Sequence, residues 1–325
     1  MSPSQDLFAA TDDRLDQRRR PSGNESADRL FRYAIYGMGG ITVGILLLMG
    51  LTIFGHSLPA IEKFGLGFLV GKDWSVPDLS FGALPLIYGT IGSSVIALLI
   101  AIPVGLSVAI ITSEDLLPKW LRTTIAFTIE LIAAIPSVIF GLWGFYTLVP
   151  LIRPVQDFLY ANFKSFPLFS TEPSGFGLLT AGMLLAIMIL PTLAAVSREV
   201  LLVVPTYLRT SSMALGATRW ETIFRVVLPT AFSGIVGGVM LALGRALGET
   251  MAVTMVIGNA ATIGPSLFEA AYSIPAILAN QFAETQDDLH TGALAYLSLI
   301  LFMLTLAVNV GAILLVKLVE RGSNK

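Results

Sequence analysis

The stretch LPTAFSGIVGGVMLALGRALGETMAVTMVIG, Leu228–Gly258, decides the fold class of this 325-residue chain. Its length of about 31 residues exceeds the roughly 20 that an apolar helix needs to cross a bilayer. Only Arg245 and Glu249 are charged within it. A charge deep in a membrane is costly unless it meets water, a partner or a counter-ion. The stretch therefore predicts a transmembrane helix whose two charges need an explanation.

The composition extends this prediction to the whole chain. Hydrophobic residues make up 54% and charged residues 13%, and the mean hydropathy is +0.78, whereas soluble domains carry roughly 25% charged residues. The net charge of −2 leaves no basic surplus to neutralise a nucleic-acid backbone. The chain has no cysteine and only two histidines, which excludes disulfides, thiolate sites and a histidine metal cluster. We therefore expect a membrane protein without a metal or cofactor, in contact with lipid and not with nucleic acid.

The apolar stretches predict an all-α membrane protein, a polytopic bundle of six transmembrane helices. A polar segment precedes them, residues 1–32, which we interpret as a disordered cytoplasmic tail. The first apolar stretch lies too far from the N-terminus for a signal peptide, so we expect it to be retained. The predicted spans are 33–54, 86–111, 124–150, 176–196, 228–258 and 292–316, within a transmembrane domain of residues 33–320 followed by a cytoplasmic tail of residues 321–325.

The distribution of Lys and Arg predicts the orientation. With both termini in the cytoplasm, 15 of the 20 basic residues lie on the cytoplasmic side, 4 lie on the outer side, and Arg245 remains inside a span. A seventh span at residues 265–283 would place the basic C-terminus outside. We therefore assign that segment to an amphipathic or re-entrant helix on the outer face.

Arg245 and Glu249 stand four residues apart, so a continuous helix would place them on one face, where they can pair. Two interpretations stay open. The pair is either a neutralised structural feature, or an anion contact in which the guanidinium binds an oxyanion and Glu249 occupies it when no anion is present. Small residues at Gly234, Gly238, Gly244 and Gly248 predict a crowded seam, either within one bundle or between subunits.

Two further features concern the second, third and fourth spans. Glu130 lies near its predicted start and either reaches back to the membrane boundary or lines a substrate pathway together with Arg245 and Glu249. Pro103, Pro136 and Pro191 fall inside the second, third and fourth spans, and each removes a helix hydrogen bond. We expect a kink at each.

The loop of residues 197–227, between the fourth and fifth spans, has the pattern of two short helices. A helix after Pro205 is expected to end near Gly216, and a second amphipathic segment leads into Pro229. By pattern alone this is also compatible with an ordinary interfacial hairpin. The sequence contains no Walker A loop, no Gly-x-Ser-x-Gly elbow and no His-Glu-x-x-His helix. Any use of ATP must therefore come from another chain.

Several motifs, in order along the chain, resemble one family. The loop segment Ala214–Ala217, with Phe224, Val227, Leu228 and Pro229, resembles the EAA loop of ABC-importer permeases, which docks into the ATPase subunit. The remaining motifs are 81–84 with 88–90, 133–144 and 244–254. Together they resemble the phosphate-specific permeases of the PstC type, over residues 30 to 320.

The loop departs from the family pattern at one place. Thr210 stands where the family has an acidic residue, and Ser211 and Ser212 stand where it has two alanines. These hydroxyls can bond locally but carry no charge. The glycine turn is kept, so the resemblance still implies ATPase docking by Thr210, Ser211, Ser212, Leu215, Gly216, Ala217, Leu228 and Pro229.

The resemblance implies the architecture of a type I ABC-importer permease and a set of partners. These are a second permease of the PstA type, a dimer of PstB-type ATPase subunits, an extracytoplasmic PstS-type binding protein and inorganic phosphate. The chain itself would not be an enzyme, because it has no ATP site. Two alternatives remain: import of another oxyanion such as molybdate or sulfate, and a passive anion channel or membrane sensor, which would need no docking hairpin.

Overall fold

The computed structural model describes residues 25–285 and 287–323, so most of the predicted N-terminal tail lies outside the described residues. The chain divides into two units, residues 1–52 and 53–325. Its elements are α2 (Glu25–Phe64), α3 (Gly67–Val70), β1 (Trp74–Ser75), β2 (Ser80–Phe81), α4 (Leu84–Ser113), α5 (Lys119–Ala133), α6 (Ser137–Trp143), the π-helical η1 (Gly144–Leu148), α7 (Val149–Phe163), the 3-10 turn η2 (Pro167–Phe169), α8 (Leu178–Val203), α9 (Thr206–Ala214), α10 (Arg219–Thr222), the π-helical η3 (Ile223–Val227), α11 (Leu228–Gly248), α12 (Met251–Thr254), α13 (Ile274–Gln281), the 3-10 turn η4 (Phe282–Glu284) and α14 (Asp288–Ser323). The two strands form one antiparallel hairpin, in which Trp74 faces Phe81.

Six helical segments of the described chain are long and apolar enough to cross a membrane, as the sequence predicted. They are 28–64, 84–113, 137–163, 178–203, 219–248 and 288–314. The α-helix within segment 265–283 is the eight-residue α13, about 12 Å long against an apolar core of about 30 Å. It does not span, as expected.

The ends of the outermost helices differ from the prediction. Helix α2 begins at Glu25, whereas the tail was predicted to extend to residue 32. Residues 25–32 contain neither Gly nor Pro, so nothing stops the helix from extending toward the N-terminus. At the other end, α14 continues to Ser323 and takes up residues assigned to the C-terminal tail.

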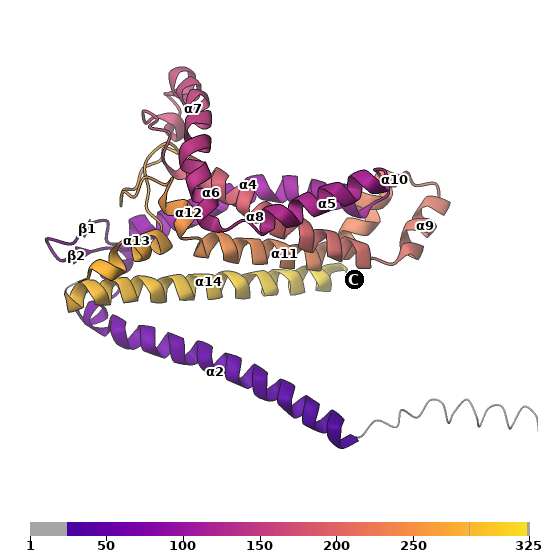
Figure 1. Ribbon diagram of the computed structural model, residues 1–325, viewed down its shortest axis with the longest axis horizontal. Coiled ribbons are helices and arrows are strands. Elements are labelled where there is room, and N and C mark those ends of the chain that lie inside the picture. The colour runs from indigo at the N-terminus through magenta and orange to yellow at the C-terminus, as the bar shows by residue number, and fades with distance from the viewer. Residues whose placement is uncertain (1–24, 286, 324–325) are drawn as a thin grey trace, which may run out of the picture. The chain divides into compact units, whose positions relative to one another are not determined.

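The third predicted span, residues 124–150, is not one helix. It is interrupted at Ala134–Pro136 between α5 and α6, because Pro136 has no N–H to continue the helix. Helix α5 lies along the bundle beside α8, whereas α7 leaves the bundle at a steep angle (Figure 1). Pro103 and Pro191, in contrast, lie inside continuous helices.

Helices α4 and α8 form the centre of the second unit and pack closely through small residues. A Cβ at Gly182 would lie 2.5 Å from Ile96, and one at Gly105 would lie 3.0 Å from Leu193. Helix α11 packs on the same core with Ala242 and Ala246. Such close backbone approach makes α4 and α8 a rigid pair, to which the other elements attach.

Two smaller clusters close the ends of this pair. At one end, Phe68, Phe81 and Ile277 pack with Leu294 of α14. At the other end, the last turns of α4 and α8 pack against η3 through Ile110, Leu201 and Val227. We call this second end the loop end, since α9 and α10 lie there (Figure 1).

Candidate functional site

The loop between α8 and α11 forms a hairpin that we call the docking hairpin, residues 205–227. Its first helix, α9, follows Pro205 and ends at a left-handed residue, Gly216, with φ of 91°. The Gly216 N–H donates to the Met213 carbonyl (3.0 Å), and the Ala217 N–H donates to the Ser212 carbonyl (3.2 Å). These two bonds form a Schellman motif, which satisfies the last carbonyls of the helix. The predicted helix and glycine turn are confirmed.

The second half of the hairpin is continuous with the fifth span. Helix α10 starts with a capping box, in which the Thr218 hydroxyl accepts from the Glu221 N–H and the Glu221 carboxylate accepts from the Thr218 N–H. It widens into η3 directly before Pro229, which has no N–H to donate to the preceding turn. Movement of the hairpin therefore reaches α11 without a hinge loop.

The tip of the hairpin exposes apolar side chains. Leu215 is 90% exposed beside the glycine turn, and Trp220 stacks on Phe224 with ring centroids 6.1 Å apart. An exposed apolar patch with a polar rim marks an interaction surface. Of the candidate residues, Leu215, Gly216 and Ala217 form this tip, and Ser211 lies on α9, which leads to it.

The remaining docking candidates lie elsewhere or turn inward. Thr210 donates to the Tyr207 carbonyl (3.1 Å), which is the local bonding expected of a hydroxyl at this position. The Ser212 hydroxyl meets that of Thr222 at 3.0 Å and ties α9 to α10. Leu228 and Pro229 belong to the first turn of α11 and not to the tip.

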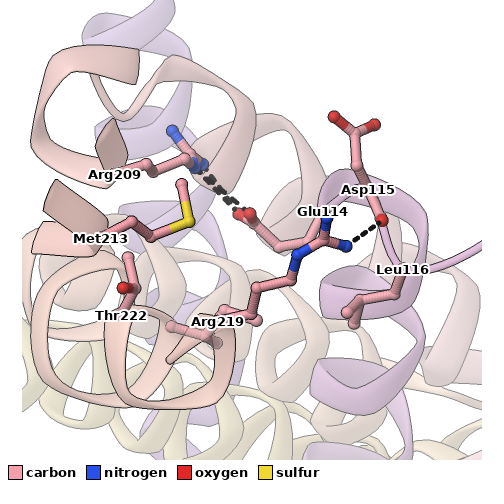
Figure 2. Close-up of a pocket in the computed structure, with 8 residues that line it drawn as sticks. Glu114, Asp115, Leu116, Arg209, Met213, Arg219 and Thr222 are labelled. Carbon is pink, nitrogen blue, oxygen red and sulfur yellow. Dashed lines mark hydrogen bonds and ion pairs between the residues drawn. The ribbon is translucent and has the colours of Figure 1, made fainter. Parts of the chain in front are cut away.

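A polar network at the base of the hairpin escaped the sequence analysis. Arg209 pairs with Glu114 at 2.8 Å, and Arg219 donates to the Asp115 carbonyl at 3.2 Å (Figure 2). The sequence places Arg209 only among the 15 basic residues of the predicted cytoplasmic side. The signal that could have found the network is the acidic pair Glu114–Asp115, which directly follows a span ending on the same side as the loop.

Arg245 lies in the last turn of α11, half-buried, and its Nη1 donates to the Thr192 hydroxyl of α8 at 3.2 Å. The sequence around Thr192 contains no recognisable motif. Only the packing of α8 on α11 brings Thr192 to Arg245. Residues Ala252 and Val253, beyond the end of α11, are buried, so the chain returns to the core directly after the turn that carries Arg245.

The predicted pairing of Arg245 with Glu249 on one helix face is wrong. Helix α11 ends at Gly248, and Glu249 adopts an extended backbone with ψ of 129°. Its carboxylate instead accepts from the Ala252 N–H (3.3 Å) at the start of α12. A carboxylate is favourable there, since the first N–H groups of a helix have no partner within it. The continuous span 228–258 is wrong for the same reason.

Glu130 does not join this arrangement. It lies on α5, which buries no residue, and its own side chain is exposed. Among the described residues, no hydrogen bond or ion pair connects Glu130 with Arg245 or Glu249.

The glycines of α11 divide into two sets. A Cβ at Gly234 would lie 2.4 Å from Val200, and one at Gly238 would lie 3.2 Å from Val196, so these two serve packing against α8 within the bundle. A Cβ at Gly244 or Gly248 would meet no atom within 4 Å. The predicted seam is therefore confirmed within the bundle for its first half only.

Six helical segments that are long and apolar enough to cross a membrane, with a helical hairpin between the fourth and the fifth, define a multi-pass membrane protein. The family model of the binding-protein-dependent transport system inner membrane component matches residues 101–325, and the chain belongs to this family.

Comparison with individual proteins agrees. The chain is 47% identical over 269 residues to the phosphate transport system permease protein PstC of Mesorhizobium japonicum, covering 80% of this chain and 82% of the relative. It is 44% identical over 293 residues to the PstC protein of Pasteurella multocida, covering 88% and 91%. Its fold is similar to that of a bacterial ABC transporter that imports alginate, with a TM-score of 0.54 and 17% identity, covering 88% and 97%. The fold is therefore that of a type I ABC-importer permease.

Proposed function

We propose that this chain is the permease subunit of an ATP-driven phosphate importer and forms, with a second related permease, the alternating-access pathway for inorganic phosphate. The observation that carries the proposal is the identity of 44–47% to relatives named phosphate transport permeases, over at least 80% of the chain. The membrane-spanning bundle and the docking hairpin are the parts such a subunit requires.

The partners in this proposal are a PstA-type permease, a dimer of PstB-type ATPase subunits and a PstS-type binding protein outside the membrane. The apolar tip around Leu215 supports ATPase docking, since its side chain is left almost fully in solvent. Hydrolysis of ATP is assigned to the partner, because the chain has no phosphate-cradling loop. The excess of Lys and Arg on the hairpin side supports a cytoplasmic location for both termini.

We assign Arg245 to anion contact in the pathway. Its guanidinium has five N–H donors, and within the part of the chain that the structure describes a single neutral hydroxyl, that of Thr192, accepts from them. Phosphate oxygens accept bidentate, charge-assisted bonds from such a group. The contact with Thr192 holds the guanidinium in place without neutralising it, so its charge stays available to a passing anion.

We place Glu249 and Glu130 along the same pathway, with lesser roles. Glu249 fixes the start of α12, just beyond the helix end that carries Arg245, so we assign it the positioning of the chain next to the anion contact. Glu130 lies on an exposed face of α5 and would line the pathway only where the second permease covers that face.

Reconstitution of the complete transporter tests the proposal. Vesicles that contain both permeases, with the ATPase subunits facing the lumen and the binding protein outside, should accumulate labelled inorganic phosphate only when ATP is enclosed. Competition by molybdate or sulfate, with weak competition by unlabelled phosphate, would indicate another oxyanion. Uptake without ATP would indicate a passive channel.

A further inference from the structure

Helix α9 of the docking hairpin is held to the bundle mainly by polar contacts. None of its nine residues is buried. Only Leu208 packs in part against the cluster at the loop end. Apolar burial therefore fixes this helix weakly, and the position of α9 depends on the side chain that is tied most firmly to the bundle.

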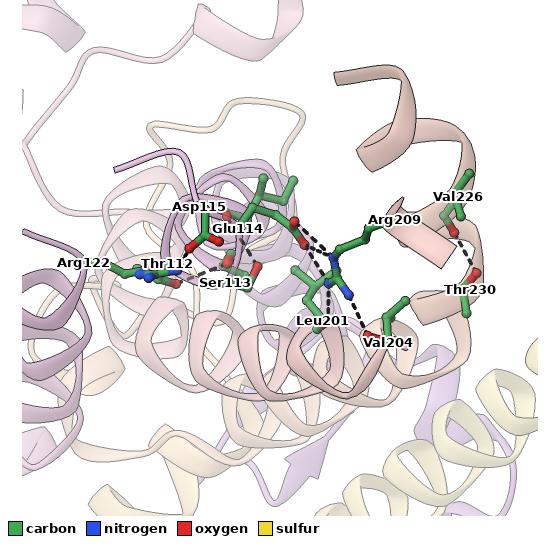
Figure 3. A network of polar contacts seen from close by, with 12 residues as sticks. Thr112, Ser113, Glu114, Asp115, Arg122, Leu201, Val204, Arg209, Val226 and Thr230 are labelled. Carbon is green, nitrogen blue, oxygen red and sulfur yellow. Dashed lines mark hydrogen bonds and ion pairs between the residues drawn. The ribbon is translucent and has the colours of Figure 1, made fainter. Parts of the chain in front are cut away.

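That side chain is Arg209, whose three guanidinium nitrogens all donate hydrogen bonds (Figure 3). Nε donates to both oxygens of Glu114 (3.2 Å each), and Nη2 donates to Oε1 of the same carboxylate (2.8 Å). Nη1 donates to the Val204 carbonyl (2.6 Å), and Nη2 also donates to the Leu201 carbonyl (2.8 Å). One guanidinium thus joins α9 to the ends of both α4 and α8.

The charges around Arg209 explain why its contacts with Glu114 and the helix ends are strong. Glu114 follows the last residue of α4, and Val204 follows the last residue of α8. Helix C-termini carry partial negative charge, so the carboxylate there needs a cation close by. The Arg209 and Glu114 side chains are only 17% and 13% exposed. Removal of either partner would leave the other mostly buried without its counter-ion.

The hairpin touches the end of α4 at a second point, where Arg219 of α10 donates to the Asp115 carbonyl (3.2 Å). A cavity of about 160 Å³ lies between the two contacts, lined by Met213, Thr222 and Ile223 (Figure 2). Helix α9 is therefore attached here by discrete polar contacts, whereas η3 of the same hairpin packs in the apolar cluster with Ile110 and Leu201.

Helix α8 connects the contacts of Arg209 with the candidate anion site. Helix α8 accepts from Arg209 at Leu201 and contacts Arg245 through Thr192. Nine residues separate these two positions, about 14 Å along one helix. Because α8 packs tightly on α4, a pull at their common end displaces both helices as one body.

We propose that Arg209, held by Glu114, is the positioning residue that transmits displacement of the docking hairpin to α4 and α8, and so to the Arg245–Thr192 contact. This inference rests on the proposed function. It assigns to this largely buried ion pair a share of the coupling between hydrolysis of ATP by the partner and movement of phosphate, beside the direct continuity of η3 with α11.

The test uses the complete reconstituted transporter and measures labelled inorganic phosphate imported per ATP hydrolysed in the same vesicles. Glu114→Gln and Arg209→Lys should each lower this ratio about ten-fold, while the ATPase subunit still co-purifies in normal amount. Lysine keeps the charge but cannot reproduce the fork that joins three helices.

Asp115→Asn is the matched control. It changes the neighbouring carboxylate, which pairs with Arg122 at 2.9 Å but is 88% exposed. An exposed pair contributes little, and the carbonyl that receives Arg219 is retained. The ratio in this variant should equal that of the wild type.

A wild-type ratio in both Glu114→Gln and Arg209→Lys overturns the proposal. Parallel loss of ATPase binding and uptake at an unchanged ratio also overturns it, because Arg209 would then merely support the hairpin. If only Arg209→Lys fails to reach the membrane, the phosphate-to-ATP ratio of the near-isosteric Glu114→Gln tests the proposal. If neither variant reaches the membrane, the ion pair serves folding and the proposal is overturned. Absence of ATP-driven uptake in the wild type would contradict the proposed function instead.

Discussion

The two arginines that contact α8 differ in how completely the protein satisfies them. Arg209 bonds to a carboxylate and two helix carbonyls, using every nitrogen of its guanidinium. Arg245 donates to the Thr192 hydroxyl and to no carboxylate among the described residues. A saturated arginine holds elements together, because any ligand would have to displace charged partners. An arginine held by one neutral oxygen retains capacity for an anion.

The largest effect should follow from removal of the less satisfied arginine. Arg245→Gln is expected to lower phosphate uptake about 100-fold or more, since the pathway loses its positive charge. Arg245→Lys should retain part of the activity, because it keeps the charge without the fork. Uptake of labelled phosphate in cells, together with the amount of co-purified ATPase, measures both variants.

The double variant Arg245→Gln with Glu249→Gln sharpens this test. Because Glu249 bonds to α12 and not to Arg245, the double variant should be as inactive as Arg245→Gln alone. Recovery of wild-type uptake in the double variant would instead identify a neutralised structural pair and contradict the assignment of Arg245.

Next in size is the effect of altering the hairpin turn. Gly216→Val places a β-branched residue at φ of 91°, at a cost of about 1–2 kcal/mol. If that strain falls on the docked form, ATPase affinity should fall about 5- to 30-fold, measured by co-purification at graded ATPase concentration. Gly216→Asn is the control, since asparagine tolerates the left-handed region. Equal ATPase affinity in Gly216→Val and Gly216→Asn would show that the conformation of the turn does not affect docking.

A smaller effect is expected at the partner of Arg245. Thr192→Val removes the hydroxyl that accepts from the guanidinium and should lower uptake roughly five-fold, because Arg245 keeps its charge and loses one positioning contact. Thr192→Ser keeps the hydroxyl and should transport normally. Equal loss in the two variants would mean that the methyl packing of Thr192 matters and its hydroxyl does not.

No change in uptake is expected from a probe of topology. The chain has no cysteine, so Gly322→Cys introduces a single thiol. An impermeant maleimide should label it only after the cells are opened, because the basic C-terminus is expected inside. Labelling of intact cells would overturn the orientation and, with it, the cytoplasmic position of the docking hairpin.

The sequence by itself determined the features that depend on local patterns. Length and hydropathy predicted six spans, and the short segment 265–283 correctly remained outside that set. The order of Pro205, Gly216 and Pro229 predicted a helix, a left-handed turn and a second helix. These predictions hold because a bilayer requires apolar helices of a minimum length, and because glycine and proline restrict the backbone wherever they occur.

Only the tertiary structure decided which charges meet. A four-residue spacing suggested that Arg245 pairs with Glu249, but the helix ends at Gly248, and each side chain finds another partner. Glu114 and Arg209 lie 95 residues apart in the chain and meet because α4 and α8 end at the same level. Sequence spacing predicts contacts within one continuous helix, whereas contacts between helices depend on where each helix ends and on which small residues let two backbones approach.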